Sequence, residues 1–359
     1  MRLRRLKAPA FVPVAYYHCV SRVVDRQFVL GENEKDKLVE YMRTYERFGG
    51  LRVISYCMMS NHFHILVEVP QRPAAAALPD DAGLVARVRT HLGDKLANDL
   101  EWQLELHRKQ GNTSAAEELR DRWFARMWDL SAFMKVLKQR FTQWFNGRHA
   151  RRGTLWEDRF RSVLVEGKGQ ALRTMAAYID LNPVRAKICD DPKDYRWCGY
   201  AEAVAGVIEA REAVEFLASL NPHGGMRPEA GGLKPKEALR RWRCHLYGIP
   251  ESEIRQAEEA AKGEMAAIYR DRIPREKALE VLARGGKLSQ ADYLRCRVRY
   301  FSDGAVIGGK AFVEEMFAAF RDRFGPKRKE GARPMRGLQG ASKEDRLFNF
   351  RQLRTGLFG

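Results

Sequence analysis

Two histidines separated by a single residue, His62 and His64, form the most informative short pattern in this 359-residue chain. They begin the run HFHILVEV, whose β-branched and apolar residues predict a strand. Because alternate side chains of a strand point to the same face, both imidazoles would project together, about 7 Å apart along the strand. Two imidazoles on one face can bind one metal ion. The alternative is a chance pair of histidines on a solvated face.

Tyr178 and Asn182 form a second pair, in the sequence AAYIDLNPVRA. They are four residues apart on a predicted helix, so their side chains project from neighbouring positions. A tyrosine hydroxyl can attack phosphorus and leave a covalent ester, and an amide oxygen is a hard ligand suited to Mg²⁺ or Mn²⁺. Structural roles are also open: Tyr178 as an aromatic residue at the core edge, and Asn182 as the end of a helix before Pro183.

The charge of the chain points to a polyanionic partner. Lysine and arginine total 64 against 46 acidic residues, a net charge of +18, and nucleic acid is the commonest partner of so basic a protein. Between Met134 and Arg173, aromatic residues are interspersed among many basic ones, a composition that suits single-stranded nucleic acid. We expect DNA contacts from five arginines: Arg22, Arg140, Arg148, Arg159 and Arg161.

The elements that must position these residues follow from periodicity and turn signals. The predicted order is strand, helix, strand, strand, helix, strand, helix, at residues 14–20, 32–48, 51–58, 62–69, 130–145, 154–167 (two short strand candidates) and 170–181. This order predicts an α+β fold, a ferredoxin-like antiparallel sheet with helices. Such a fold does not by itself indicate a function.

Composition shifts divide the chain further. Residues 1–70 and 128–200 are predicted to form the domain that carries the candidate catalytic residues, and 71–127 a helical insertion with a break at Gly111-Asn112. Residues 201–359 are predicted to form a basic, mainly α-helical C-terminal region, with helices after the linker at 237–247, 251–272, 276–284, 290–300 and 310–324. A linker rich in proline and glycine at 221–236 predicts a domain boundary, so we expect a chain ending near Ser219 still to be active. Two predicted helices around a glycine-containing turn within 292–317 resemble a helix-turn-helix, for which DNA contact and a packing or dimerisation role both stay open.

The cysteines and the apolar runs indicate the cellular compartment in which the protein is expected. The six cysteines show no CxxC pair and no zinc-ligand spacing, which fits free thiols in a reducing cytoplasm. No apolar run approaches the ~18 residues of a membrane span, so we expect a cytoplasmic protein without a membrane partner.

Five blocks of sequence together resemble a known family. They are YHCVSRVVDRQFVL, YCMMSNHFHILVEVP, FMKVLKQRFTQWFN, GTLWEDRFRSVLVE and YIDLNPVRA, in that order from Tyr16 to about Lys187. They resemble the HUH single-tyrosine transposases, and more narrowly the branch of REP-associated tyrosine transposases. The segment from 71 to 129 is longer than that branch leads us to expect, and the region after 200 extends beyond its catalytic core.

The resemblance implies a role for each candidate residue. His62 and His64 would bind a divalent cation, Mg²⁺ or Mn²⁺, with Asn182 completing the metal site. Tyr178 would be the nucleophile that leaves a 5′-phosphotyrosine and a free 3′-hydroxyl. The implied partner is single-stranded DNA folded into hairpins like repetitive extragenic palindromes, which the enzyme cleaves and rejoins. Oligomerisation stays open.

Two rival interpretations remain. One is a domesticated protein that binds structured DNA or RNA without cutting it, against which the presence of all four candidate residues argues. The other is a nuclease that serves its host and does not move itself, which the sequence does not separate from the enzyme of a mobile element.

Overall fold

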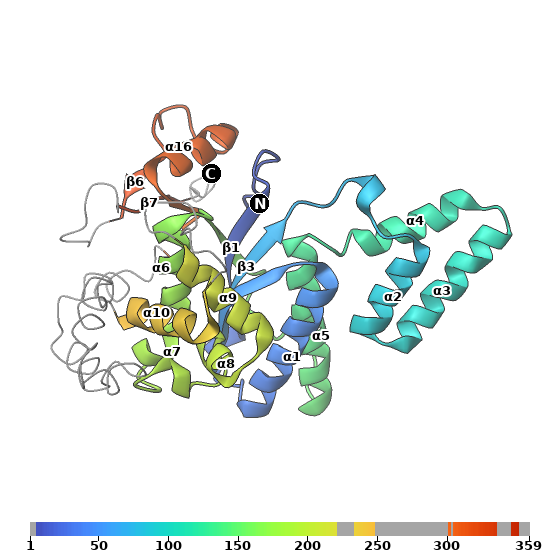
Figure 1. Ribbon diagram of the computed structural model, residues 1–359, viewed down its shortest axis with the longest axis horizontal. Helices are drawn as coiled ribbons and strands as arrows, with labels where there is room; N and C mark the ends of the chain where they lie inside the picture. The colour runs from blue at the N-terminus through green and yellow to red at the C-terminus, as the bar shows by residue number, and fades with distance from the viewer. Residues whose placement is uncertain (1–4, 221–232, 248–300, 303, 336–345, 352–359) are drawn as a thin grey trace.

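The computed structural model describes residues 5–220, 233–247, 301–302, 304–335 and 346–351 (Figure 1). Their centre is a seven-stranded sheet with the order β2-β3-β1-β4-β5-β7-β6. All neighbouring strands run antiparallel except β4 and β5. The strands are β1 (Val14–Arg22), β2 (Arg52–Met58), β3 (His62–Pro70), β4 (Arg161–Val165), β5 (Val306–Gly308), β6 (Arg333–Pro334) and β7 (Phe348–Phe350). The predicted α+β class, with a mostly antiparallel sheet, is confirmed.

The pairing of β1 with β3 and β4 fixes which side chains share a face. Val20 of β1 lies opposite His64 on one side and opposite Arg161 on the other. Arg22 lies opposite His62. Because residues directly opposite each other in antiparallel strands project to the same side, these five side chains belong to one face of the sheet.

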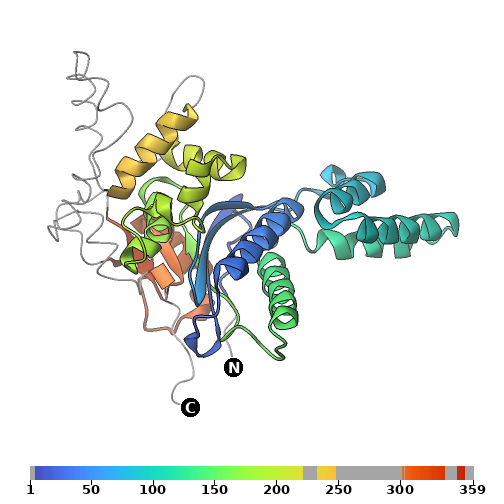
Figure 2. The same cartoon turned by 90° about the horizontal axis from the view of Figure 1, so that it is seen from below.

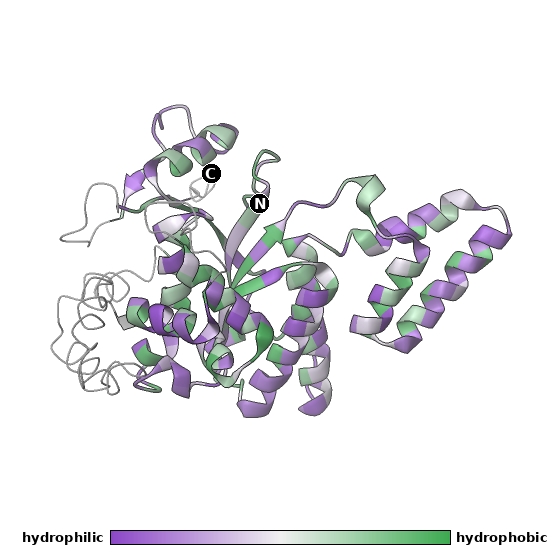
Figure 3. Ribbon diagram, in the orientation of Figure 1, coloured by the Kyte–Doolittle hydropathy of each residue, from purple (hydrophilic) through white to green (hydrophobic). Residues whose placement is uncertain are grey.

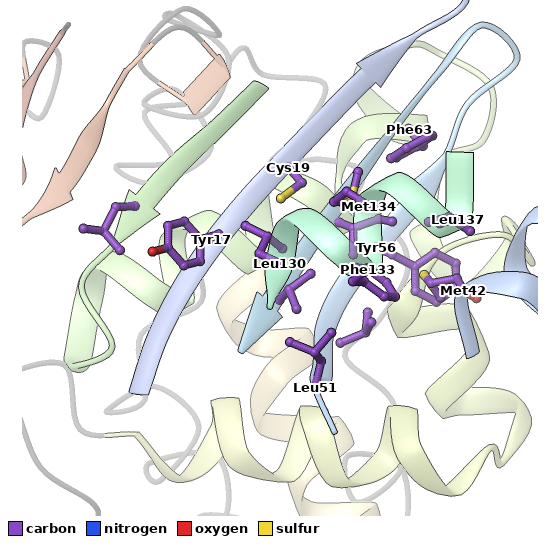
Figure 4. Packing of buried hydrophobic residues seen from close by; sticks show 14 of the residues in the cluster. Tyr17, Cys19, Met42, Leu51, Tyr56, Phe63, Leu130, Phe133, Met134 and Leu137 are labelled. Atoms are coloured by element: carbon purple, nitrogen blue, oxygen red, sulfur yellow. The ribbon is translucent and has the colours of Figure 1, made fainter. Parts of the chain in front are cut away.

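Helices α1 (Glu32–Gly49) and α5 (Leu130–Arg148) cover the opposite face. The side chain of Asp129 caps α5 by accepting a hydrogen bond from the N–H of Ala132, and α1 ends at Gly50, whose left-handed φ of 63° suits glycine. Figure 4 shows Phe63 of β3 in the same apolar cluster as Phe133 and other α5 residues. Phe63 therefore points away from the face that carries its two histidine neighbours.

The histidine face is covered by α6 (Gly169–Asp180), and the short helix α7 (Asn182–Arg185) follows it directly. Further helices complete this layer: α8 (Gly199–Ala205), α9 (Ile208–Ser219) and α10 (Pro235–Tyr247). Figure 2 shows the sheet between this layer and the α1–α5 layer. Single turns of 3-10 helix lie at Val24–Arg26, Ala75–Ala77, Pro192–Asp194 and Arg321–Arg323.

Helices α2 (Asp81–Leu92), α3 (Asp94–Lys109) and α4 (Thr113–Phe124) project away from the sheet (Figure 1). They enclose an apolar cluster of their own that includes residues of all three. Figure 3 colours α3 as largely hydrophilic and β2 and β3 as largely hydrophobic. The break at Gly111 agrees with the sequence, but a second break, at Gly93 with φ 96°, was not predicted.

The C-terminal region contributes strands as well as helices. Helix α10 agrees with the helix predicted at 237–247, and α16 (Lys310–Ala319) with the start of the one predicted at 310–324. Strands β5, β6 and β7 were not predicted, because runs of two or three residues are too short to show an alternating pattern. The helices predicted at 251–272, 276–284 and 290–300 lie outside the described residues.

Three further expectations disagree with the structure. Of the two short strands expected in 154–167, only β4 forms, and 154–160 contributes a single isolated bridge between Val23 and Trp156. Within the suggested helix-turn-helix, the described residues 306–308 are a sheet strand. Since β5 pairs with β4, a chain ending near Ser219 would lose three strands of the sheet, which argues against the expectation that it stays active.

None of the described helices has the length and apolar character needed to cross a membrane.

Asp180, the last residue of α6, joins the helices of the histidine side to the sheet. Its Oδ1 accepts a hydrogen bond from Ser55 Oγ of β2 (2.9 Å), and its Oδ2 accepts one from Trp242 Nε1 of α10 (2.9 Å). The backbone N–H of Tyr200 in α8 also donates to it. Complete burial nevertheless raises the pKa of the Asp180 carboxyl to about 7.

This buried carboxyl predicts a specific pH dependence of stability. The pKa of Asp180 is about 7 in the folded chain against an ordinary value of 3.8, so the folded state binds more protons between these values and loses stability as the pH rises. We expect the unfolding free energy of the wild type, relative to Asp180→Asn, to fall by up to ~1.4 kcal/mol per pH unit between about pH 4 and 7, and then to level off. Urea titrations of both proteins at several pH values measure this difference in unfolding free energy. A difference that stays constant with pH would contradict the prediction.

Candidate active site

The two histidines of β3 and the tyrosine of α6 come together on the face that α6 covers. The ring centroids of His62 and His64 are 5.0 Å apart, and the Tyr178 ring meets His64 edge to face at 5.8 Å. Tyr178 is 1% exposed and His64 3% exposed. The strand alternation and the helix spacing thus bring the histidine pair and the tyrosine, more than 100 residues apart in the chain, into one cluster.

A third histidine, His18 of β1, lies in the same cluster and was not predicted from the sequence. Its Nε2 is 2.8 Å from Nδ1 of His64, and its Nδ1 is 2.8 Å from the carbonyl oxygen of Phe301. Its ring stacks on that of His64 with centroids 5.1 Å apart. The sequence did contain a signal for His18. Residues an even number of positions apart in a strand lie on the same face, so His18 and Arg22, four residues apart, share one face of β1.

Hydrogen bonding assigns the tautomers of His18 and His64. A carbonyl oxygen only accepts, so Nδ1 of His18 carries the hydrogen that is donated to Phe301. The Nε2 of His18 is then an acceptor, and Nδ1 of His64 donates to it. This leaves a lone pair on Nε2 of His64.

The same reasoning applies to His62. The amide nitrogen of Asn61 donates to the carbonyl of Arg26 (3.0 Å), which orients the amide oxygen toward Nδ1 of His62, 2.6 Å away. Nδ1 of His62 therefore donates, and its Nε2 keeps a lone pair. Both histidines of the motif thus present an unprotonated Nε2.

Burial keeps all three imidazoles neutral at neutral pH. It lowers the pKa of His18 and of His62 to about 4, and the pKa of His64 well below its ordinary value. The positive charges of Arg22 and Arg185 lower the pKa of His62 and His64 further. Neutral imidazole is the form that binds metal ions.

Asn182 lies at the junction of α6 and α7 and caps the first of them. Its Nδ2 donates to the carbonyl oxygens of Tyr178 (3.0 Å) and Ile179 (3.3 Å), in the last turn of α6. An amide nitrogen has no free lone pair, so Oδ1 is the atom of the side chain that can act as a ligand. The capping role and the ligand role considered from the sequence are therefore compatible.

These donors fit a divalent cation. Two neutral Nε2 atoms and one amide oxygen make a mixed nitrogen and oxygen set of the kind that Mn²⁺ and Mg²⁺ sites use together with water or phosphate oxygens. Within the described part of the chain, no group of three or more histidine, cysteine, aspartate or glutamate side chains could hold a metal ion by itself.

Tyr178 is enclosed by two residues to which the sequence analysis gave no role. The ring of Phe301 stacks on it with centroids 4.5 Å apart and an interplanar angle of 21°. The guanidinium carbon of Arg185 lies 4.6 Å from its ring centroid. Phe301 is 123 residues away in sequence, and no local pattern could have linked it to the tyrosine.

Tyr195 and Tyr200, the next tyrosines along the chain after Tyr178, are buried in structural positions. The hydroxyl of Tyr195 donates to the carbonyl oxygen of Met58 (2.6 Å), and burial raises the pKa of both Tyr195 and Tyr200. Neither ring is among those in contact with His64 in the described residues.

The five arginines predicted to contact DNA fall on two sides of the sheet. Arg22 and Arg161 belong to the histidine face, and Arg159 is exposed just before β4. Arg140 and Arg148 lie on α5, which covers the other face. Arg140 donates to the hydroxyl of Tyr45 (3.2 Å), and the Arg148 guanidinium lies over Trp144 and 3.7 Å from Glu34.

Part of the chain is similar to known proteins. Residues 11–78 match the family model described as "Transposase IS200 like". Over this segment, which is about a fifth of the chain, the match agrees with the resemblance to transposases found in the sequence blocks. The IS200-like segment contains β1, α1, β2 and β3, and so all three clustered histidines, whereas Tyr178 and Asn182 lie beyond it.

The solved structures to which the chain is similar include "Structure of the REP associates tyrosine transposase bound to a REP hairpin". The identity is 14% and the TM-score 0.35, with 57% of this chain and 86% of that chain covered. No curated protein matches the chain.

The hydrogen-bond chain predicts a tautomer that can be observed directly. Long-range ¹H–¹⁵N spectra of histidine-labelled protein at pH 7 should show His64 protonated at Nδ1 and not at Nε2. Changing His18→Leu removes the acceptor, so the His64 hydrogen should shift toward Nε2. The matched change His149→Leu, at the end of α5, should leave the His64 signals in place. A wild-type His64 protonated at Nε2 would contradict the assignment.

Proposed function

We propose that the chain is a metal-dependent transposase that cleaves and rejoins single-stranded DNA through a covalent tyrosine intermediate. The observation that carries this proposal is the contact of Tyr178 with His64, one of two neutral histidines that present unprotonated Nε2 atoms. The IS200-like segment, which holds both histidines, supports the same activity.

His62 and His64 would hold the cation, with Oδ1 of Asn182 as a third ligand. A bound Mg²⁺ or Mn²⁺ supplies Lewis-acid polarisation of a phosphate oxygen. The protein orients its ligands by the hydrogen bonds from Nδ1 of each histidine and from Nδ2 of the asparagine.

The covalent step uses Tyr178. A bond forms between its hydroxyl oxygen and phosphorus, the bond between phosphorus and the 3′ oxygen breaks, and the phenolic proton is transferred overall to that oxygen. The products are a 5′-phosphotyrosine and a free 3′-hydroxyl. Because one phosphate ester replaces another, a second 3′-hydroxyl can reverse the step and join strands without an energy source.

The partner that fits this site is single-stranded DNA carrying a hairpin. The net charge of +18 and the cationic side chains beside the histidines, Arg22 and Arg161, favour a phosphate backbone. The family resemblance of the five sequence blocks implies that the bound strand folds into a hairpin.

One observation favours a second candidate, a protein that binds hairpins without cutting them. Tyr178 is 1% exposed beneath Phe301, so a DNA phosphate reaches its hydroxyl only after the side chains that cover it move. If that movement does not occur, the same surface binds DNA and no reaction follows.

The nucleophile is tested with a hairpin oligonucleotide labelled at its 3′ end. Wild-type protein with Mn²⁺ should carry the label into a covalent species on a denaturing gel, whereas a 5′ label should be released with the 3′-hydroxyl product. Tyr178→Phe should bind the hairpin as the wild type does and form no covalent species. Tyr41→Phe, on α1 at the other face, is the matched control and should react normally.

A covalent species in Tyr178→Phe would move the nucleophile to another residue. Binding by the wild type with no covalent species at any metal concentration would refute the transposase and support the non-cleaving protein.

The two-sided distribution of arginines predicts which of them contact DNA. Arg161→Gln and Arg22→Gln should each flatten the slope of log affinity against log salt by about 0.7, the value for one phosphate contact with a single strand. Arg140→Gln, on α5, should leave the slope unchanged because that residue lies across the sheet from the histidines. Fluorescence anisotropy between low and moderate salt measures the slopes, and an equal loss in all three variants would contradict this placement.

A further inference from the structure

Arg185 lies beside Tyr178 and within the block YIDLNPVRA, but neither the sequence analysis nor the proposed mechanism gives it a role. It lies at the end of α7, and its backbone N–H donates to the carbonyl of Leu181 (2.9 Å), continuing the turn that follows α6. Its guanidinium carbon lies 4.6 Å from the Tyr178 ring centroid. The side chain is half-buried, so it extends from the protein surface to the candidate nucleophile.

The guanidinium is incompletely satisfied within the protein. Its Nη1 atom is buried and has no hydrogen-bond partner among the described residues. Arg43 shows the usual arrangement for a buried arginine, with Nη1 2.6 Å from Glu46 and a second ion pair to Glu202. A buried charged donor without an acceptor costs free energy, which an anionic ligand would offset.

The surroundings of Arg185 favour an anion. Its charge and that of Arg22 act on His62 and His64, and no described carboxylate forms an ion pair with either arginine. Positive charge therefore gathers beside neutral imidazoles and the tyrosine. A guanidinium donates to phosphate oxygens through paired N–H groups, and such charge-assisted hydrogen bonds are strong.

We propose that Arg185 binds a non-bridging oxygen of the phosphodiester that Tyr178 attacks. Its Nη1–H would donate to this oxygen and hold phosphorus beside the tyrosine hydroxyl, and its charge would stabilise the negative charge that develops on the phosphate in the transition state. The inference rests on the proposed function, because it assigns Arg185 to the same DNA strand.

The test is a double-mutant cycle with one change in the protein and one in the DNA. The protein change is Arg185→Gln, and the DNA change replaces one phosphate at a time along the hairpin oligonucleotide by a neutral methylphosphonate. Binding is measured in the Tyr178→Phe background, so that no strand is cut. At one position, the methylphosphonate alone and Arg185→Gln alone should each weaken binding by about 10- to 100-fold, and the two together by no more than either. That position should be the phosphate that the wild type cleaves.

Two controls keep the outcome specific. Arg161→Gln should weaken binding additively with the methylphosphonate at that position, because it contacts a different phosphate. Arg185→Lys keeps the charge but not the paired donors, so it should retain part of the coupling, and it guards against a loss caused by misfolding of the glutamine variant.

The inference is overturned if Arg185→Gln and the methylphosphonates act additively at every position. Failure of the proposed function looks different: the wild type would then form no covalent species with the unmodified hairpin, whereas coupling at a single phosphate would still establish Arg185 as a phosphate-binding residue.

Discussion

The hydrogen bond between Nε2 of His18 and Nδ1 of His64 is the interaction on which the rest of the site depends. It joins β1 to β3 inside the face that α6 covers, and it continues to the carbonyl of Phe301 near the C-terminal strands. Because both acceptors in this chain are fixed, His64 has one possible tautomer, and its Nε2 is the nitrogen left for a ligand. Without the antiparallel register of β1 against β3, the two imidazoles would not meet.

Burial sets the electrostatics of the site. Burial lowers the pKa of all three histidines and keeps them neutral, and the charges of Arg22 and Arg185 lower the pKa of His62 and His64 further. A site of neutral nitrogen ligands with arginines at its edge is suited to a divalent cation and a phosphate together, since the phosphate supplies the negative charge that the protein lacks. The same burial encloses Tyr178, so the packing that holds the tyrosine beside His64 also keeps a DNA phosphate away from its hydroxyl.

Much of the framework could be predicted from the sequence because its elements are long and regular. The alternation in 62–69 predicted which way His62 and His64 point, and the periodicity of 170–181 predicted the helix that carries Tyr178. The short strands β5 to β7 gave no periodic signal, so their place in the sheet was not predicted. Their pairing shows that the C-terminal region shares a core with β1 and β4.

The parts of the site that were missed depend on tertiary proximity. His18 is a single histidine in an apolar strand, and only its pairing with β3 reveals its partner. Phe301 reaches Tyr178 across 123 residues, and Arg185 gains significance from an unpartnered nitrogen that no sequence displays. Conversely, Arg140 and Arg148 matched a basic and aromatic pattern, yet α5 places them across the sheet from the histidines.

The most direct test of the central claim is the position of a bound Mn²⁺ in crystals of the wild-type protein, located by anomalous diffraction. The hydrogen-bond network predicts one ion within coordination distance of Nε2 of both His62 and His64, with Oδ1 of Asn182 turned toward it. An ion bound through Nδ1 of either histidine, or ordered manganese found only away from these two side chains, would contradict it.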